Sequence, residues 1–214
     1  IGTLASGIAH ELNNPLNNIY LATQIMAREL NQESCPEIVR EIMQDIFSQT
    51  LRVKRIVSDL LEFAREKAPQ LKKISIAQIA KDVMQQMMNS GEMSGIKFNL
   101  HCHEEIEIMG DRHLLEQVFI NLFSNAADAM GASGSLNITI QKVKSAVEIT
   151  ISDTGKGIAP EDIPRVFDPF FTTKEKGTGL GLAIVYGIIG KHNGYIKVDS
   201  RLNEGTTFTI TLPC

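Results

Sequence analysis

Residues 147–158 read VEITISDTGKGI, and this stretch decides the fold of the second half of the chain. Val147, Ile149 and Ile151 alternate with polar residues, which is the period-two pattern of a β-strand with one buried face. Asp153 continues the alternation, so its carboxylate falls on the same face as these apolar residues. The glycines that follow are typical of a turn. We therefore expect a strand that ends in a carboxylate on its buried face.

Similar patterns before and after this strand predict a mixed domain with α+β architecture. Helices are expected at residues 76–88, 111–130 and 180–192, and strands at 96–102, 136–141, 147–153, 195–200 and 206–212. Helices mixed with antiparallel hairpins are typical of a two-layer α/β sandwich.

The first third of the chain carries a helical pattern instead. Residues 3–31 and 37–67 each show one apolar stripe, and a turn between Asn31 and Pro36 joins them into a hairpin. Two amphipathic helices cannot enclose a core alone, so a dimeric four-helix bundle is expected. By itself this segment fits a plain dimerisation coiled coil equally well. The expected domains are a hairpin at 1–68, a linker at 69–75 and the α+β domain at 76–214.

His10 lies on the first predicted helix but away from its apolar stripe. It is two residues from both Ile8 and Leu12, about 200° around the helix, so it is expected to face water. Glu11 places a carboxylate next to it. An exposed imidazole beside a fixed acid is a candidate nucleophile. Pro15 predicts a kink just after His10, because it lacks an N–H for the carbonyl of Glu11.

Composition limits the classes of partner. The chain has 214 residues, 43% hydrophobic residues and a net charge of −4, which predicts a globular protein without a broad basic surface for nucleic acid. No apolar run approaches the about 18 residues of a membrane span, so no membrane contact is expected within this stretch. Three scattered cysteines favour a reducing, cytoplasmic setting, whether or not the full-length protein is membrane-attached. The chain begins at Ile1 inside a periodic pattern, so we expect it to be a fragment.

Two amides on one predicted helix are candidate metal ligands. Asn121 and Asn125 lie one helical turn apart, so both side chains share a face. Magnesium prefers oxygen ligands and is a suitable partner when substrate phosphates share the site. The alternative is a pair of amides whose partners are backbone groups.

The turn after residue 153 and a second glycine cluster suggest a nucleotide. Asp153 at the rim of an apolar pocket could accept a hydrogen bond from an exocyclic amine such as that of adenine, with a Thr206 hydroxyl beside it. Gly177, Gly179 and Gly181 precede a helix, where backbone N–H groups can approach phosphate oxygens. Taken alone, the glycine cluster is equally typical of a turn that caps a helix, and the Asp153 string is more often an ordinary turn.

Together these motifs resemble the sensor histidine kinases of two-component signalling, and the resemblance covers nearly the whole chain. It implies a phosphoacceptor helix hairpin followed by a GHKL-type (Bergerat) ATP-binding domain. His10 matches the phosphoacceptor, and Glu11 matches the acid that orients the imidazole and takes its proton. Asn14 matches the position held by Thr or Asn in members that also hydrolyse the phosphate on their partner regulator.

The resemblance also implies a nucleotide site. Asn121 and Asn125 match the amides that bind magnesium and triphosphate, and Asp153 matches the carboxylate that reads adenine. A lysine common after the second amide is replaced by Asp128, so its charge is assigned to Lys156, Lys174 or Lys176. The complete expected nucleotide-binding set is Asn121, Asn125, Asp128, Asp153, Gly155, Lys156, Gly157, Ile158, Phe170, Thr173, Lys174, Lys176, Gly177, Thr178, Gly179, Leu180, Gly181, Leu182 and Thr206.

The implied reaction uses ATP and Mg²⁺. ATP would phosphorylate His10, and the phosphoryl group would then pass to an aspartate on the receiver domain of a response regulator. The implied assembly is a homodimer formed through the hairpin. Two other classes remain open on the sequence: a GHKL-type ATPase that drives conformational change without phosphohistidine, and a dimerisation module that binds nucleotide without turnover.

Overall fold

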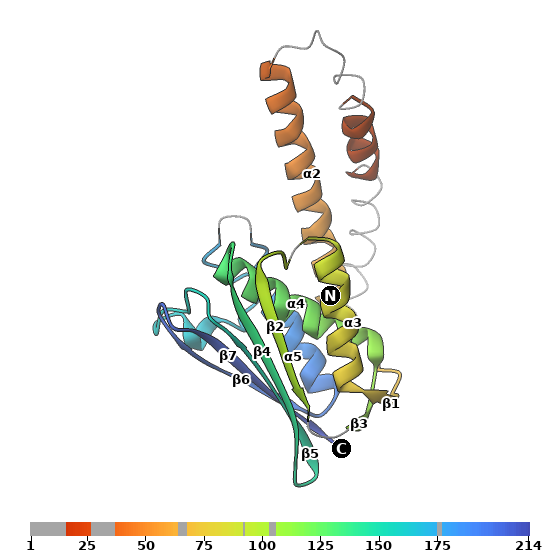
Figure 1. Cartoon of the computed structure of the whole chain (residues 1–214). Coiled ribbons are helices and arrows are strands. Elements are labelled where there is room, and N and C mark those ends of the chain that lie inside the picture. The colour runs from red at the N-terminus through yellow and green to blue at the C-terminus, as the bar shows by residue number, and fades with distance from the viewer. Residues whose placement is uncertain (1–15, 27–36, 64–67, 92, 103–105, 175–176) are drawn as a thin grey trace. The chain divides into compact units, whose positions relative to one another are not determined.

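The chain divides into two compact units. The computed structural model describes residues 16–26, 37–63, 68–91, 93–102, 106–174 and 177–214 (Figure 1). The helical unit comprises Ile1–Glu66 and Thr172–Leu180, and the sheet unit comprises Lys67–Phe171 and Gly181–Cys214. Over the described residues, we find no helix with the length and apolar character needed to cross a membrane.

The described part of the helical unit contains two helices, as the apolar stripes predict. Residues 16–26 form the first, and α2 (Glu37–Phe63) forms the second. Their packing is fixed by aromatic contacts: the rings of Tyr20 and Phe47 stack with centroids 5.2 Å apart. Lys54 Nζ lies 5.4 Å from the centroid of the Tyr20 ring. The predicted turn, the kink at Pro15 and His10 lie outside the described residues.

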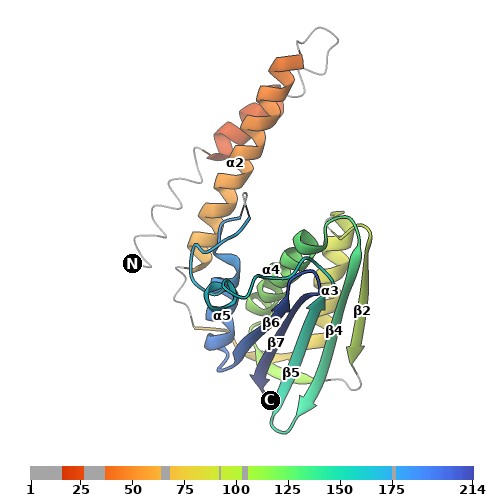
Figure 2. The ribbon, with the colours of Figure 1, turned by 90° about the vertical axis from the view of Figure 1, so that its left-hand side faces the viewer.

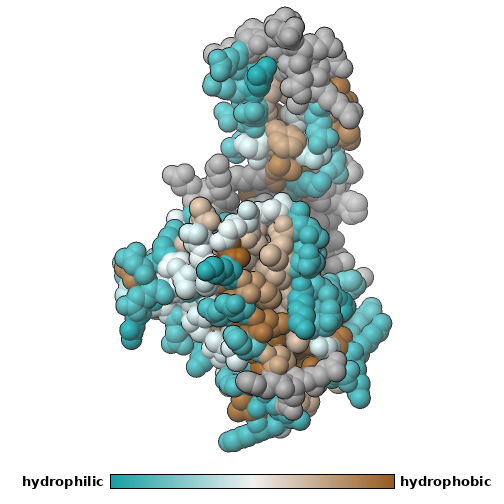
Figure 3. Space-filling model, in the orientation of Figure 1, coloured by the Kyte–Doolittle hydropathy of each residue, from teal (hydrophilic) through white to brown (hydrophobic). Residues whose placement is uncertain are grey.

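Helix α2 has two apolar faces with different surroundings. Met43 and Val57 are buried, at 7% and 3% exposure, and lie two heptads apart on the face that also carries Phe47. A neighbouring face remains open, and apolar side chains are visible on the surface of this unit (Figure 3). The exposed apolar residues of α2 are Ile42, Ile46, Leu51, Val53 and Ile56.

The sheet unit is built on a five-stranded sheet with the order β2-β4-β5-β7-β6. Strand β2 pairs parallel to β4, and the remaining neighbours are antiparallel. A separate antiparallel pair joins β1 to β3. The strands are β1 (Lys72–Ser75), β2 (Ile96–Cys102), β3 (Glu107–Gly110), β4 (Gly134–Val143), β5 (Ala146–Asp153), β6 (Tyr195–Arg201) and β7 (Gly205–Pro213).

Three helices cover one face of this sheet, which gives a two-layer α/β sandwich (Figures 1 and 2). They are α3 (Ile76–Asn89), α4 (Arg112–Met130) and α5 (Gly181–Lys191), and a short 3-10 helix, η1, spans Ile163–Arg165. The strands bury alternate residues under the helices, as period two requires. The inward-facing residues of the three central strands are Leu136, Ile138, Ile140, Val147, Ile149, Ile151, Phe208, Ile210 and Leu212.

The start of α4 is fixed by Asp111. Its Oδ1 accepts hydrogen bonds from the N–H groups of His113 and Leu114 at 3.1 and 3.3 Å, which caps the helix. Its Oδ2 accepts from the N–H of Gln70 at 2.8 Å. The N–H of Asp111 donates to Nε2 of His192 at 2.9 Å, so the residue after α5 is tied to the same point.

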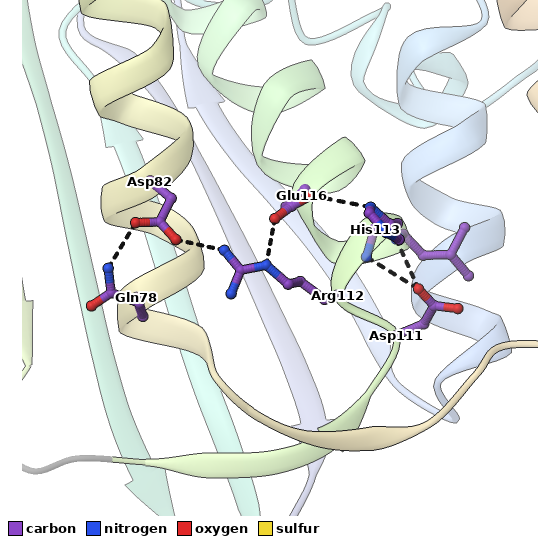
Figure 4. Close-up of polar contacts among 7 residues, drawn as sticks. Gln78, Asp82, Asp111, Arg112, His113 and Glu116 are labelled. Atoms are coloured by element: carbon purple, nitrogen blue, oxygen red, sulfur yellow. Dashed lines mark hydrogen bonds and ion pairs between the residues drawn. The ribbon is translucent and has the colours of Figure 1, made fainter.

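Ion pairs continue from this cap along the outside of α4. The Arg112 guanidinium bonds Asp82 of α3 and Glu116 of α4, which links the two helices (Figure 4). Gln78 in turn donates to Asp82 at 2.7 Å. Because Arg112 is 45% exposed, each pair contributes little stability alone, but the network joins the first turn of α4 to the middle of α3.

The helices and long strands agree with the sequence patterns, whereas two features of the sheet unit were not predicted. Strands β1 and β3 contain four residues each, too few to show a period. The parallel pairing of β2 with β4 also departs from the antiparallel hairpins that the sequence suggests. Periodicity reports which face of a strand is buried, but it does not report which strand lies next to it.

Replacing Asp111 with alanine removes the cap of α4 and the contact with Gln70. We expect the free energy of unfolding to fall by about 1–2 kcal/mol at neutral pH. Burial would raise the pKa of the Asp111 carboxyl, but the N–H groups of Gln70, Leu114 and His113 outweigh it and hold that pKa below its usual value. The contribution is therefore complete above the usual aspartate pKa and is lost as the pH falls through the lower, folded-state pKa.

Urea denaturation at neutral and acidic pH measures this effect. Asp162→Ala is the matched control, because Asp162 precedes η1 without a side-chain capping bond and should change stability by no more than about 0.5 kcal/mol. Equal stability of Asp111→Ala and the wild type would contradict the capping role.

Candidate functional site

The site is built around the buried end of β5. Asp153 is only 7% exposed and lies opposite Thr206 of β7. Its Oδ1 accepts from the N–H of Gly155 at 2.8 Å and from the N–H of Thr206 at 3.3 Å. Within the described part of the chain, no group donates a hydrogen bond to the other oxygen, Oδ2. A ligand that donates a hydrogen bond would satisfy this oxygen.

Burial raises the pKa of the Asp153 carboxyl above its usual value, and the N–H groups of Gly155 and Thr206 offset only part of this rise. The folded protein therefore holds a carboxylate in a place where its charge is unfavourable. Such a shift is common where a group serves a ligand rather than the fold.

The turn after Asp153 is packed against the end of α4. The N–H of Lys156 donates to the carbonyl of Ala129 at 3.1 Å. A Cβ on Gly155 would lie 2.7 Å from the Cβ of Ala129, so only glycine fits this approach. Gly157 has a φ of +70°, and a Cβ there would collide with the carbonyl oxygen of Arg201. The glycines thus bring the turn close to both α4 and β6.

Ser200, which the sequence analysis missed, connects this turn to the terminal hairpin. Its Oγ accepts from the N–H of Ile158 at 2.8 Å, donates to the carbonyl of Gly205 at 2.9 Å and lies 2.9 Å from Oγ1 of Thr206. A signal was present: Ser200 shares its strand face with Ile196 and Val198, as Asp153 does with the apolar residues of β5.

The two predicted amides lie on α4 and are both half-buried. Asn121 Nδ2 donates to the carbonyl of Gly181 at 3.3 Å, and Asn121 Oδ1 accepts from Nε2 of Gln117 at 3.4 Å. Asn125 follows one turn later, and Asp128 is exposed three residues beyond it. The carbonyl of Gly181 therefore orients the Asn121 amide with its nitrogen toward α5.

This donor set fits magnesium only in part. Amide oxygens are hard ligands of the kind that magnesium accepts. Among the residues that the structure describes, no three or more His, Cys, Asp and Glu side chains are grouped to hold a metal ion. A magnesium ion at Asn121 and Asn125 would therefore need further oxygen ligands from water and from a bound phosphate.

The remaining predicted residues are divided between the two units. The sheet unit contains Lys156, which is exposed, and Phe170, which is 64% exposed with a φ of +67°. Gly181 and Leu182 begin α5 there. Predicted residues of the segment Thr172–Leu180, which is grouped with the helical unit, are Thr173, Lys174, Gly177, Thr178, Gly179 and Leu180. His10, Glu11, Asn14 and Lys176 lie outside the described residues.

Local hydrogen bonds shape the described part of that segment. The N–H of Lys174 donates to Thr172 Oγ1 at 3.1 Å, and the N–H of Gly177 donates to the carbonyl of Lys174 at 3.2 Å. The N–H of Leu180 donates to Thr178 Oγ1 at 3.3 Å. These are turns built by threonine side chains, as the composition of the segment suggests.

Asp153→Asn tests whether this carboxylate serves a ligand at the expense of stability. The amide keeps the acceptor for Gly155 and Thr206 but removes the buried charge. We expect the melting temperature at neutral pH to rise by about 2–4 °C, the shift that about 1 kcal/mol produces at this size. Because the folded-state pKa is raised, wild-type stability falls as the pH rises through it, so the gain should vanish below the usual aspartate pKa.

Differential scanning calorimetry across the acidic range checks this expectation. Asp199→Asn, at an exposed position of β6, is the control and should leave the melting temperature unchanged. A lower melting temperature for Asp153→Asn at neutral pH would contradict the account.

Comparison with known families agrees with this geometry. Residues 110–214 match the family described as histidine kinase-, DNA gyrase B- and HSP90-like ATPase. Residues 1–69 match the His Kinase A (phospho-acceptor) domain. Fold and site thus define a protein in which a phospho-acceptor helical domain precedes an ATPase domain.

Individual relatives show which proteins of this class the chain is similar to. The chain is 34% identical over 216 residues to the sensor histidine kinase ZraS of Escherichia coli (strain K12), a match that covers 100% of this chain and 45% of ZraS. It is 32% identical to the catalytic domain of histidine kinase ThkA, with a TM-score of 0.62 over 67% of this chain and 95% of that domain. ThkA in complex with the response regulator protein TrrA gives 27% identity and a TM-score of 0.70, over 99% of this chain and 61% of that chain.

The chain belongs to the histidine kinase family. The resemblance to sensor histidine kinases is confirmed, and so is the predicted order of a helical hairpin followed by a two-layer α/β domain. The match of residues 1–69 separates this chain from ATPases that lack a phospho-acceptor domain. The chain spans less than half the length of ZraS.

Proposed function

We propose that this chain is the catalytic core of a sensor histidine kinase that transfers the γ-phosphoryl group of ATP to His10 and then to an aspartate of a response regulator. The observation that carries the proposal is the open oxygen of the buried Asp153 carboxylate beside a glycine turn. The match of residues 1–69 to a phospho-acceptor domain supplies the acceptor that such a site requires.

Residues of the sheet would recognise the base of the nucleotide. Asp153 Oδ2 would accept a hydrogen bond from the exocyclic amine of adenine. Gly155 packs closely on Ala129, which fixes the turn that follows this carboxylate. Because Asp153 is held by two backbone N–H groups, its carboxylate is oriented before the nucleotide arrives. Little reorganisation is then needed on binding.

Phosphate positioning in the sheet unit would fall to α4. Asn121 and Asn125 carry side-chain amides on one face of this helix, whereas the predicted phosphate-binding glycines Gly177 and Gly179 belong to the segment grouped with the helical unit. Asn121 and Asn125 are the residues that would hold a magnesium ion, and such an ion would supply positive charge for the triphosphate. Lys156, which is exposed in the sheet unit, would add positive charge to this region.

The chemical step needs a neutral imidazole. The Nε2 lone pair of His10 would attack the γ-phosphorus as the bond to the ADP oxygen breaks, which gives phosphohistidine and ADP. Glu11 would accept the Nδ1–H, which fixes the tautomer and takes the proton. A receiver aspartate would then attack the phosphorus and break the P–N bond. Asn14 is the candidate for positioning a water if the chain also removes phosphate from the regulator.

Histidine labelling tests the reaction directly. With magnesium and γ-labelled ATP, the wild type should retain label that is stable to alkali and lost in acid. His10→Gln should abolish the label and leave ADP affinity unchanged, because the nucleotide contacts lie elsewhere. His101→Gln, an exposed histidine of β2, is the control and should label normally.

The outcomes separate the classes of protein. Label that persists in His10→Gln would show that another residue is the acceptor. ADP release without any bound label in the wild type would indicate a simple ATPase. Binding of ATP with neither release nor label would indicate a nucleotide-binding module.

We further propose that the chain acts as a homodimer through its helical unit. The open face of α2 carries Ile42, Ile46, Val53 and Ile56, which are 36–53% exposed in the single chain. Their spacing places them beside the buried face with Met43 and Val57, as a four-helix bundle requires. A second copy would bury both open faces.

Sedimentation equilibrium tests the dimer. The wild type should sediment as two chains, and Ile46→Glu should shift it to a single chain because a charge at this position would be buried. Gln44→Glu, at an exposed polar position of the same helix, should remain dimeric. A monomeric wild type over a wide concentration range would contradict the proposal.

A further inference from the structure

Ser200 occupies a position that the proposed reaction does not itself explain. Its hydroxyl contacts three segments at once: the turn at Ile158, the start of β7 at Gly205 and the side chain of Thr206. Ser200 and Thr206 are also direct partners in the β6–β7 register. One small side chain therefore joins the segments that surround Asp153.

The hydrogen positions in this cluster follow from counting donors. The carbonyl of Gly205 can only accept, so the single hydrogen of the Ser200 hydroxyl is used there at 2.9 Å. The N–H of Ile158 takes one lone pair of Ser200 Oγ. The contact of 2.9 Å with Thr206 Oγ1 must then be a hydrogen bond that Thr206 donates. Thr206 keeps only lone pairs for any other partner.

This assignment fixes the polarity of the site beside Asp153. Thr206 is 5% exposed, and its N–H donates to Asp153 Oδ1 at 3.3 Å, so the two residues are direct neighbours. The Asp153 carboxylate presents Oδ2 as an acceptor, and Thr206 Oγ1 presents a second acceptor. The edge of a base placed here would face two hydrogen-bond acceptors, Asp153 Oδ2 and Thr206 Oγ1, and neither side chain would offer it a donor.

We propose that Ser200 is a positioning residue that holds the Thr206 hydroxyl as an acceptor and thereby makes the site select a purine with an exocyclic amine over one with a carbonyl at the same position. The inference rests on the proposed nucleotide binding. An exocyclic amine can donate one hydrogen bond directly to Asp153 and another to Thr206 through a water. A carbonyl oxygen would face two acceptors and remain unpaired, which is unfavourable in a buried site.

Loss of Ser200 should relax this selection rather than merely weaken the site. Without the serine, the Thr206 hydroxyl is free to rotate and can donate its hydrogen to a carbonyl on the base. The preference for the purine with the amine should therefore fall, because the purine with the carbonyl gains affinity relative to it. A purely structural role would weaken both bases alike.

Calorimetric titration of the protein with ADP and with IDP tests the inference, because inosine carries a carbonyl where adenosine carries the amine. We expect the wild type to prefer ADP, and Ser200→Ala to reduce the ratio of IDP to ADP dissociation constants about five- to tenfold, the effect of one neutral hydrogen bond. Ser200→Thr keeps a hydroxyl and should restore the ratio.

The chain offers a matched control on the opposite face of the sheet. Ser152 Oγ lies 2.9 Å from Thr207 Oγ1, and these residues are direct partners in the β5–β7 register. Both are half-buried, and the pair repeats the chemistry of Ser200 and Thr206 one residue further along β7. Ser152→Ala should leave the ratio unchanged, since its partner hydroxyl points away from Asp153.

The possible results are distinct. An unchanged ratio in Ser200→Ala, with wild-type binding of ADP intact, overturns the inference alone. A wild type that binds neither nucleotide overturns the proposed function and the inference with it. If Ser200→Ala does not fold, as judged by circular dichroism, Ser200→Cys replaces it, because the thiol is a weak donor and acceptor and should lower the ratio in the same way.

Discussion

The buried carboxylate of Asp153 is the interaction on which the rest of the site depends. It ends β5, the central strand of the sheet, at a position where the alternation would otherwise place an apolar residue. Two backbone N–H groups hold one oxygen, while burial keeps the pKa of the carboxyl raised. The fold thus tolerates an unfavourable charge whose second oxygen receives no hydrogen bond from the described residues and is open to a donor on a ligand, which is how a binding site differs from a core.

Helix α4 connects this charge to the amides that we propose for phosphate positioning. Its N-terminus is fixed by Asp111 and the Arg112 network, and its C-terminal end receives the turn after Asp153 through Ala129. Between these two points lie the amides Asn121 and Asn125. Because both ends of the helix are held, the amides are positioned by the same rigid element that supports the turn after Asp153, which would favour a single geometry for both parts of a bound nucleotide.

Much of this could be predicted from the sequence because it rests on periodicity. Alternation placed Asp153 on the buried face, and helical spacing placed Asn121 and Asn125 together. Contacts between distant segments could not be predicted from the sequence. The hydrogen bond from Asn121 to Gly181, for example, depends on how α4 packs against α5. Ser200 was overlooked for the same reason: a serine at a strand end is common, and what distinguishes this one is its three partners from separate segments.

Strand register explains how two identical hydroxyl pairs can have different consequences. Thr206 and Thr207 are neighbours in sequence, but the alternation of β7 sends the first toward Asp153 and the second to the outer face of the sheet. A slip of one residue would exchange them and would turn the apolar face of β7 outward. That register is secured by apolar pairs along β5 and β7, such as Ile151 with Phe208 and Ile149 with Ile210. The polarity of the proposed nucleotide site therefore depends on core residues that would touch no ligand as much as on the residues that would bind it.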